Sequence, residues 1–190
     1  VGSEVINNFE QKFARFQDAK YCISTSSGTT ALWVALKSAG VKGGDEVIVP
    51  PYSFVATVSA VLMANAVPVF VDIDPNTFNI DSNKIEQAIT NKTKVIMPVH
   101  LSGRVCQMDK IMKIANKHNL KVVEDAAQAI GSKYKNKMSG SYGEIGCFSA
   151  HPLKNLNAVG DSGYLTTNNQ KIYTETKDLI NHGMTSNRNI

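Results

Sequence analysis

The 190-residue sequence lacks the features that mark several classes of protein. It has three cysteines, Cys22, Cys106 and Cys147, with no metal-type spacing between them. We therefore expect reduced thiols in a cytoplasmic protein, with neither a disulfide framework nor a metal site. No charged-then-apolar leader opens the chain, and its longest apolar runs are too short to span a bilayer, so we expect no membrane partner.

A strong charge of one sign is also missing, since 20 Lys and Arg residues against 16 Asp and Glu give a net charge of +4. The lysines are dispersed and form no dense basic run, as in Lys84, Lys92, Lys94, Lys110, Lys113, Lys117 and Lys121. This dispersal is typical of a solvated face, and we expect no nucleic acid as a partner.

Internal repeats, low-complexity tracts and linkers are absent as well. With 43% hydrophobic and 19% charged residues, the composition is that of a globular protein, and one domain over residues 1–190 is the simplest interpretation. Four segments, VIV (47–49), PVFV (68–71), VIMPV (95–99) and KVVE (121–124), are apolar on consecutive positions. Strands of this kind are buried on both faces, which indicates an α/β fold with a mostly parallel sheet between helix layers.

Apolar spacing predicts the order of the elements. Strands are expected at Tyr21–Ser24, Glu46–Val49, Val67–Val71, Val95–Pro98, Lys121–Glu124, Ile145–Phe148 and Gly163–Thr166. Helices are expected at Glu4–Phe16, Ala31–Ser38, Phe54–Ala64, Ser82–Ala88, Gln107–His118 and Gln170–Asn181. Open parallel sheets bind ligands beyond the carboxyl ends of their strands, so the loops that follow the strands are where chemistry is expected.

The first such loop is Ser27-Gly28-Thr29, between a strand and a helix. Gly28 lets the backbone approach an oxyanion closely, and the free N–H groups at the start of a helix suit a phosphate. The alternative is a plain helix N-cap at Ser26 or Ser27. The segment matches neither a Walker loop nor a G-x-G-x-x-G motif.

The second loop is Glu124-Asp125-Ala126-Ala127-Gln128. Two acids leaving a buried strand would place a carboxylate at the edge of a site, and the alanines leave room for a flat ligand. The alternative is that Asp125 caps a helix.

The third loop runs from Cys147 to Asn155, where Ser149 follows a strand, Pro152 bends the chain and Lys154 comes next. Lysine forms Schiff bases when its surroundings lower its pKa from about 10.4. A surface lysine is the alternative, and we expect His151 to be structural. An anion cradle, an acid and an amine in this order are what a pyridoxal 5′-phosphate (PLP) enzyme must supply.

At this point the sequence resembles the DegT/DnrJ/EryC1/StrS family of PLP-dependent (fold type I) sugar aminotransferases. The segments that carry the resemblance are SSGTTALWVAL, GDEVIVPPYSFVATVSAV, VFVDID, PVHLSG, VVEDAAQAIGSKY and GEIGCFSAHPLKNLNAVGDSGYLTTNN. They run in family order over nearly the whole chain, and EDAAQA followed by FSxHPxKNL is a specific combination. Two positions depart from the family pattern: Ala150, where an aromatic is usual, and Ser162, where a second glycine is common.

The resemblance implies a three-layer α/β/α large PLP-binding domain, with a small C-terminal domain following outside this chain. Lys154 would hold the cofactor as a Schiff base and move the proton between cofactor and substrate carbons. Asp125 would pair with the pyridinium nitrogen, since a carboxylate there favours the protonated ring. Among the other cofactor-binding residues, Gln128 would bond the ring's phenolic oxygen and Phe54 would stack on the ring. The phosphate would be held by Gly28, Thr29 and Ser149.

The resemblance also implies a homodimer that transfers an amino group, by family habit from glutamate, to the keto group of a nucleotide-linked deoxysugar. One alternative is a PLP-dependent sugar dehydratase or lyase, but such relatives carry histidine in place of Lys154. Another is a non-catalytic regulatory relative, which the intact Lys154, Asp125 and Gln128 disfavour. The sugar, its keto position and its nucleotide remain open.

Overall fold

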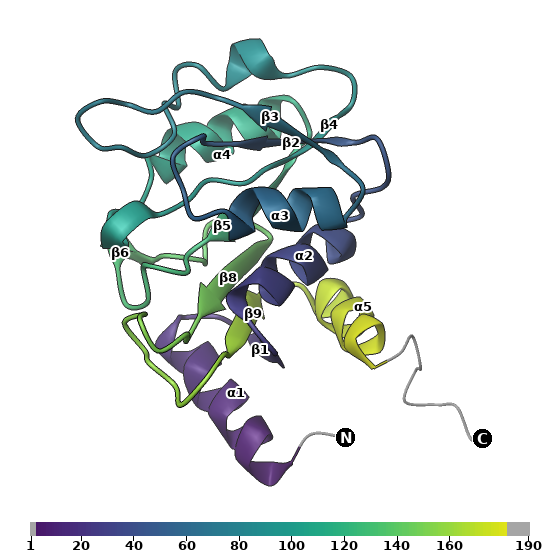
Figure 1. Cartoon of the computed structure of the whole chain (residues 1–190), viewed down its shortest axis with the longest axis vertical. Coiled ribbons are helices and arrows are strands. Elements are labelled where there is room, and N and C mark those ends of the chain that lie inside the picture. The colour runs from purple at the N-terminus through teal and green to yellow at the C-terminus, as the bar shows by residue number, and fades with distance from the viewer. Residues whose placement is uncertain (1–2, 182–190) are drawn as a thin grey trace.

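The computed structural model describes residues 3–181 of the chain (Figure 1). Its helices are α1 (Glu4–Phe16), α2 (Gly28–Ser38), α3 (Ala56–Met63), η1 (Glu86–Ala88), η2 (Leu101–Gly103), α4 (Met108–Lys117) and α5 (Gln170–Ile180). Its strands are β1 (Tyr21–Thr25), β2 (Glu46–Val49), β3 (Val67–Phe70), β4 (Thr93–Ile96), β5 (Lys121–Asp125), β6 (Lys133–Tyr134), β7 (Lys137–Met138), β8 (Ile145–Ser149) and β9 (Gly163–Thr167).

Seven strands form one sheet in the order β1-β9-β8-β5-β4-β2-β3. Strand β9 runs antiparallel to both of its neighbours, and the pairs from β8 to β3 are all parallel. Helices α2, α3 and α5 pack on one face of the sheet, while α4 and α1 lie on the other, as Figure 1 shows for α2, α3 and α4. The expected three-layer α/β/α architecture with a mostly parallel sheet is confirmed.

Burial on both faces of the sheet explains the consecutive apolar positions. In β2, Val47 and Val49 belong to the core beneath α2 and α3, whereas Ile48 belongs to the core beneath α4. A third cluster joins α1 to the sheet through Phe13 and Phe148, whose rings meet edge to face at 5.2 Å between centroids. Neighbouring side chains of one strand thus enter different cores, which is the arrangement of a central parallel sheet.

Capping residues set the ends of the first two helices. Ser3 accepts the N–H of Ile6 at the start of α1, and Ser27 accepts the N–H of Thr30 at the start of α2. Helix α2 ends before Gly40, whose φ of +85° is the left-handed conformation that glycine adopts without strain. Together these signals fix where α2 begins, and its first turn lies at the edge of the candidate site.

Some of the expected boundaries are wrong. The helix expected at Ser82–Ala88 is only the short η1, because Asp81 accepts the N–H groups of Asn83 and Lys84 and closes a turn there. The strand expected at Val95–Pro98 lies two residues earlier, at Thr93–Ile96. The small β6–β7 hairpin was not expected. Residues 1–2 and 182–190, part of the domain predicted over 1–190, lie outside the described residues.

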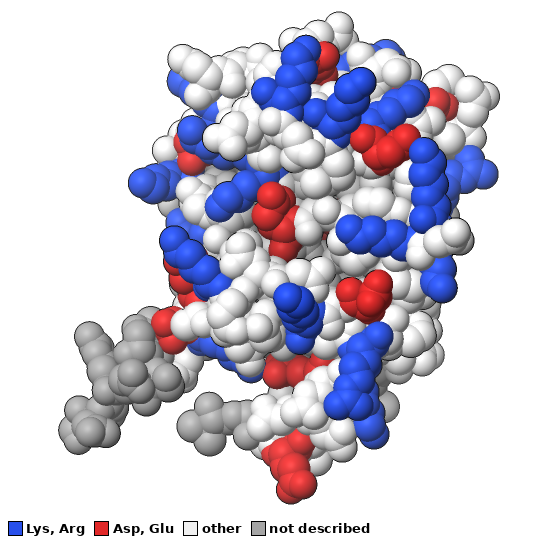
Figure 2. All heavy atoms as spheres, turned by 180° about the vertical axis from the view of Figure 1, so that it is seen from behind, with Lys and Arg blue, Asp and Glu red and all other residues white. Residues whose placement is uncertain are grey.

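The surface has the mixed charge expected from the sequence. Figure 2 shows Lys and Arg side chains spread over one face with acidic groups among them, not gathered into a single patch. Within residues 3–181, no helix combines the length and the apolar character needed to cross a membrane.

Candidate active site

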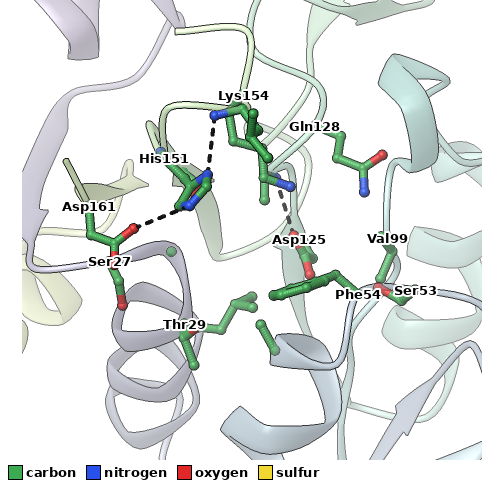
Figure 3. A pocket seen from close by; sticks show the side chains of 16 residues that line it. Ser27, Thr29, Ser53, Phe54, Val99, Asp125, Gln128, His151, Lys154 and Asp161 are labelled. Atoms are coloured by element: carbon green, nitrogen blue, oxygen red, sulfur yellow. Dashed lines mark hydrogen bonds and ion pairs between the residues drawn. The ribbon is translucent and has the colours of Figure 1, made fainter. Parts of the chain in front are cut away.

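A cavity of about 510 Å³ opens at the carboxyl ends of the parallel strands, where the sequence predicted chemistry. Figure 3 shows the side chains of several loops converging on it. All seven residues predicted for the site lie on its wall, namely Gly28, Thr29, Phe54, Asp125, Gln128, Ser149 and Lys154. They come from the start of α2, the loop after β2, the end of β5 and the segment after β8, so the fold brings together residues that are 126 positions apart (28 to 154).

The start of α2 has the geometry of an anion cradle. Ser27 is its N-cap, so the capping alternative is correct for this residue. The first i to i−4 bond of the helix runs from the Ala31 N–H to the Ser27 carbonyl, and the N–H groups of Gly28 and Thr29 precede it. These two N–H groups and the positive end of the helix dipole lie at the cavity wall, where a phosphate would be stabilised.

Close packing around this first turn requires two glycines. A Cβ on Gly28 would lie 2.7 Å from the Cβ of Ser149, so the turn rests directly against the end of β8. A Cβ on Gly163 of β9 would lie 2.2 Å from the carbonyl oxygen of Ser27. The hydroxyl of Ser149 is therefore held beside the N–H groups of the helix start.

Asp125 ends β5 and is 5% exposed. Its Oδ2 accepts the hydroxyl of Thr57 at 2.8 Å, and its Oδ1 accepts the N–H of Ala127 at 3.2 Å. Burial raises the pKa of the carboxyl, while the bonds from Thr57 and Ala127 and the nearby His100 and Lys154 act to lower it. No helix follows Asp125, so the alternative of a helix cap is wrong.

The amide of Gln128 is oriented by the backbone. Its Oε1 accepts the N–H of Ser102 at 2.7 Å, and Ser102 adopts a left-handed conformation with φ of +50°. With the oxygen engaged, the Nε2 hydrogens remain as donors toward a ligand. Figure 3 shows Gln128 across the cavity from Ser27 and Asp161.

Lys154 lies in a compact turn after β8. Its N–H donates to the His151 carbonyl at 2.8 Å, and the Leu153 N–H donates to the His151 ring at Nδ1 (3.1 Å). His151 thus has a structural contact in the turn, and its ring also lines the cavity. The Lys154 Nζ lies 5.8 Å from the centre of the Phe54 ring, so amine and aromatic face the same space.

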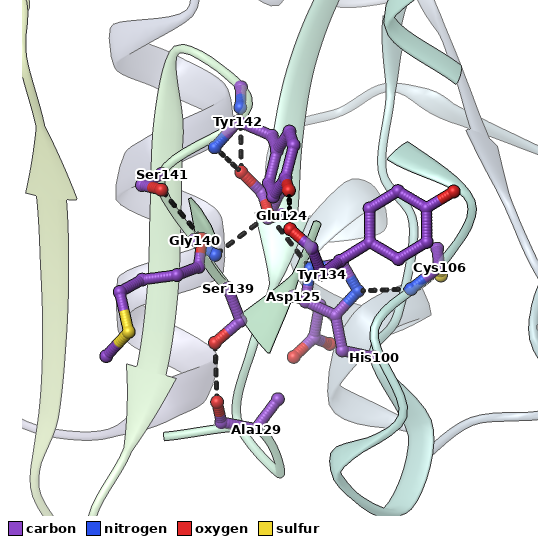
Figure 4. A network of polar contacts seen from close by, with 12 residues as sticks. His100, Cys106, Glu124, Asp125, Ala129, Tyr134, Ser139, Gly140, Ser141 and Tyr142 are labelled. Atoms are coloured by element: carbon purple, nitrogen blue, oxygen red, sulfur yellow. Dashed lines mark hydrogen bonds and ion pairs between the residues drawn. The ribbon is translucent and has the colours of Figure 1, made fainter. Parts of the chain in front are cut away.

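The acid next to Asp125 has a different task. Glu124 is fully buried and does not line the cavity. Figure 4 shows its carboxylate among Gly140, Tyr142 and His100. Its two oxygens accept the N–H groups of Gly140, Tyr142 and Gly143 and the Nε2 of His100, at 2.7 to 2.9 Å. The backbone N–H of His100 in turn donates to the Asp125 carbonyl. Glu124 therefore anchors the end of β5 that carries Asp125.

Several residues of the site were not predicted. The cavity is also lined by Leu32, Ser53, Ala56, Val99, Ala127, His151, Leu153 and Asp161. Ser53 lies in the loop before α3 and Thr57 in the first turn of that helix, and no motif reasoning gave either residue a role. Ala150, by contrast, is buried in the core beneath α1 and does not line the cavity.

The cysteines and the acids form no metal centre in the described part of the chain. Cys22, Cys106 and Cys147 are free and buried. Residues 3–181 contain no group of three or more His, Cys, Asp or Glu side chains placed to hold a metal ion.

A three-layer fold with a lysine, a buried aspartate and a helix N-terminus around one cavity is the architecture of the PLP-dependent aminotransferases. The chain belongs to the DegT/DnrJ/EryC1/StrS aminotransferase family, whose model matches residues 2–190. The resemblance drawn from the motifs is thereby confirmed.

Three relatives illustrate the match. The chain is 45% identical to a GDP-perosamine synthase of Caulobacter vibrioides, over 99% of this chain and 50% of that protein. It is 43% identical to a UDP-2-acetamido-2-deoxy-3-oxo-D-glucuronate aminotransferase of Pseudomonas aeruginosa, over 96% and 51%. It also resembles the crystal structure of NtdA from Bacillus subtilis with bound cofactor PMP, with a TM-score of 0.94 and 41% identity, over 100% and 42%. The chain therefore spans about half the length of these relatives.

Proposed function

We propose that the complete protein is a PLP-dependent aminotransferase that transfers an amino group, from glutamate, to the keto group of a nucleotide-linked deoxysugar. The observation that carries the proposal is the meeting of Lys154, Asp125 and the start of α2 in one cavity. The nucleotide-linked sugars named for two relatives support the substrate class. In this proposal, residues 1–190 are the large, cofactor-binding domain of a cytoplasmic enzyme.

The cavity fits PLP in three respects. Its volume of about 510 Å³ lies within the range of about 300–1,000 Å³ of small-molecule sites. Gly28 keeps the first turn of α2 against Ser149, which leaves N–H and hydroxyl groups for a phosphate. Asp125 is a buried carboxylate with charge-stabilising partners, the kind of group that a pyridinium nitrogen requires.

Each residue would then have a defined task. Gly28, Thr29 and Ser149 would bind the phosphate, Phe54 would cover one face of the ring, and Gln128 would donate to the phenolic oxygen. Asp125 would hold the proton on the ring nitrogen. PLP supplies an electron sink when bound, and the protein supplies its orientation and its electrostatics.

Lys154 would attach the cofactor through Nζ and, once displaced by an amino substrate, would take up and return the migrating proton. The cavity wall opposite this turn carries Phe54, whose ring lies near the Nζ. The turn built by His151 and Leu153 would keep the amine aimed at that space.

We also infer that a second copy of the protein completes the site. Phe54 and Leu153 line the cavity and are exposed. Tyr52 and Val55 are exposed close to Phe54 in the chain, and the exposed Phe78 ring lies 6.0 Å from that of Tyr52. Grouped exposed apolar residues next to a site mark surfaces that are covered in an assembly. A homodimer would cover them and shield the reacting groups from water.

The test is a panel of nucleotide-linked 3-keto and 4-keto sugars, each offered to the full-length protein with PLP and glutamate. The proposal predicts a product whose mass reports one exchange of oxo for amino, with loss of the product when glutamate is omitted. Deoxygenation without any amino donor would instead identify a dehydratase. A protein that binds PLP but never passes into the amino form of the cofactor with glutamate would contradict the proposed activity.

A further inference from the structure

A chain of hydroxyl groups leads from the cavity wall to the buried Asp125. Ser53, in the loop after β2, has its Oγ 2.7 Å from the Oγ1 of Thr57 on α3. The Thr57 Oγ1 lies 2.8 Å from the Oδ2 of Asp125 on β5. Thr57 is fully buried, and Ser53 lines the cavity beside Phe54 (Figure 3).

The direction of these bonds follows from the number of protons. An ionised Asp125 only accepts hydrogen bonds, so the single hydroxyl proton of Thr57 is given to it. Thr57 then offers only lone pairs to Ser53, and the Ser53 hydroxyl must donate. Both bonds point toward the carboxylate, which is the orientation that stabilises its negative charge.

This carboxylate has few other partners. Its remaining hydrogen bond comes from the N–H of Ala127 at 3.2 Å, which is longer. Burial alone favours the protonated carboxyl, which could not hold a pyridinium proton. The hydrogen bond from Thr57 to Asp125 Oδ2, at 2.8 Å, is therefore the shorter of the two, and it favours the ionised carboxylate against the effect of burial.

We propose that Thr57, supported by Ser53, is a positioning residue that keeps the Asp125 carboxylate ionised and fixed in orientation for the cofactor nitrogen. The proposal rests on the proposed PLP function and extends it to two residues of the segment GDEVIVPPYSFVATVSAV to which the sequence assigned no role. It also couples Asp125 to the loop that carries Phe54, since Ser53 and Phe54 are neighbours. The acid under the ring and the aromatic on its face would then be held by one hydrogen-bonded unit.

The experiment measures, by equilibrium dialysis, the PLP dissociation constant of the full-length protein and of three variants. Thr57→Val keeps the shape but removes the hydroxyl, and about tenfold weaker binding is expected, the scale of one hydrogen bond to a charged group. Thr57→Ser restores the donor and should bind within about threefold of wild type. Thr176→Val is the matched control, because it removes a buried hydroxyl bonded to Ser38, away from the cavity. It should leave the dissociation constant unchanged.

A double-mutant cycle separates charge from packing. Beside Asp125→Asn, where the group is neutral, Thr57→Val should change PLP binding by about threefold or less. The proposal would be overturned if Thr57→Val bound PLP with wild-type affinity. It would also be overturned if Thr57→Ser bound PLP as weakly as Thr57→Val. Should Thr57→Val not fold, Ser53→Ala carries the test, with about threefold weaker binding in support and unchanged binding against.

The protein without PLP provides a second readout. Thr57→Val should lower the thermal midpoint more at pH 8 than at pH 5, because a larger fraction of Asp125 is ionised at the higher pH. The other titratable groups facing Asp125 are His100, Lys154 and Cys147, which the variant leaves in place. An equal shift at both pH values would contradict the charge-stabilising role. Failure of the wild-type protein to bind PLP would overturn the proposed function. Wild-type binding that Thr57→Val leaves unchanged would overturn only the role of Thr57.

Discussion

The Glu124 network allows one prediction about stability to be worked through. Glu124→Gln replaces a buried carboxylate with an amide of the same shape. Oε1 accepts the N–H groups of Tyr142 and Gly143, both at 2.7 Å, and Oε2 accepts the Gly140 N–H at 2.8 Å and His100 Nε2 at 2.9 Å. The amide NH₂ must occupy one of these two positions, so two acceptor contacts become contacts between donors.

The size of the effect follows from the bonds lost. A hydrogen bond to a charged group contributes about 1.5–3 kcal/mol, so losing two lowers the free energy of unfolding by about 3–6 kcal/mol. This is a large share of the roughly 5–15 kcal/mol that stabilises a typical domain. With about 2–4 °C per kcal/mol in a domain of this size, the thermal midpoint should fall by about 6–24 °C.

The assay is thermal and urea unfolding of the full-length protein without PLP, followed by circular dichroism. Glu144→Gln is the matched control, because Glu144 makes one such bond, accepting the Val122 N–H at 2.7 Å, and a glutamine oxygen can replace it. The control should change the free energy of unfolding by about 1 kcal/mol or less. If Glu124→Gln has the same free energy of unfolding as the control Glu144→Gln, the Glu124 network does not anchor β5.

Three further predictions concern the site and its surroundings. Gly28→Ala should weaken PLP binding at least about tenfold but barely change pyridoxal binding, because its Cβ would lie 2.7 Å from the Cβ of Ser149 within the proposed phosphate cradle. An equal loss of affinity for both ligands would argue against a phosphate site there. Burial raises the pKa of the Cys22 and Cys147 thiols, so neither should react with a thiol reagent in the native protein at pH 8. Peptide mass spectrometry would detect the label, and rapid labelling of the native protein would contradict the burial of these thiols. Burial also raises the pKa of Asp125 above its unfolded value near 3.9, so its contribution to stability is lost as pH rises through the folded pKa. Without PLP, the thermal midpoint of Asp125→Asn should therefore rise relative to that of wild type from pH 4 to 7. A difference between the two midpoints that stays constant with pH would contradict this.

The strands were predictable because their signal is local. β2 and β5 are apolar on consecutive positions, and burial on both faces of a sheet requires that pattern. The helix expected at Ser82–Ala88 failed for an equally local reason, since the Asp81 side chain accepts the N–H of Asn83 and the Asp81 carbonyl accepts the N–H of Lys84, which closes a turn. The β6–β7 hairpin has two residues in each strand, too few for periodicity to indicate.

The candidate site was predictable where a residue ends a strand, as Asp125 and Ser149 do. Thr57 escaped because its role depends on Asp125, which is 68 positions further along the chain and meets it only after α3 packs near β5. The same holds for Ser102, which lies in the segment PVHLSG, because the contact of its backbone N–H with Gln128 depends on a left-handed turn that the sequence does not reveal. The sequence therefore indicates which residues line the cavity, whereas the contacts that hold their side chains in place depend on tertiary packing.

The central claim is that Lys154 is the lysine that binds PLP. The most direct measurement is borohydride reduction of the full-length protein loaded with PLP, followed by peptide mass spectrometry. The account predicts a phosphopyridoxyl group on the peptide that contains Lys154, and its loss in Lys154→Ala. A label on another lysine with Lys154 unmodified, or an undiminished label on the same peptide in Lys154→Ala, would contradict the account.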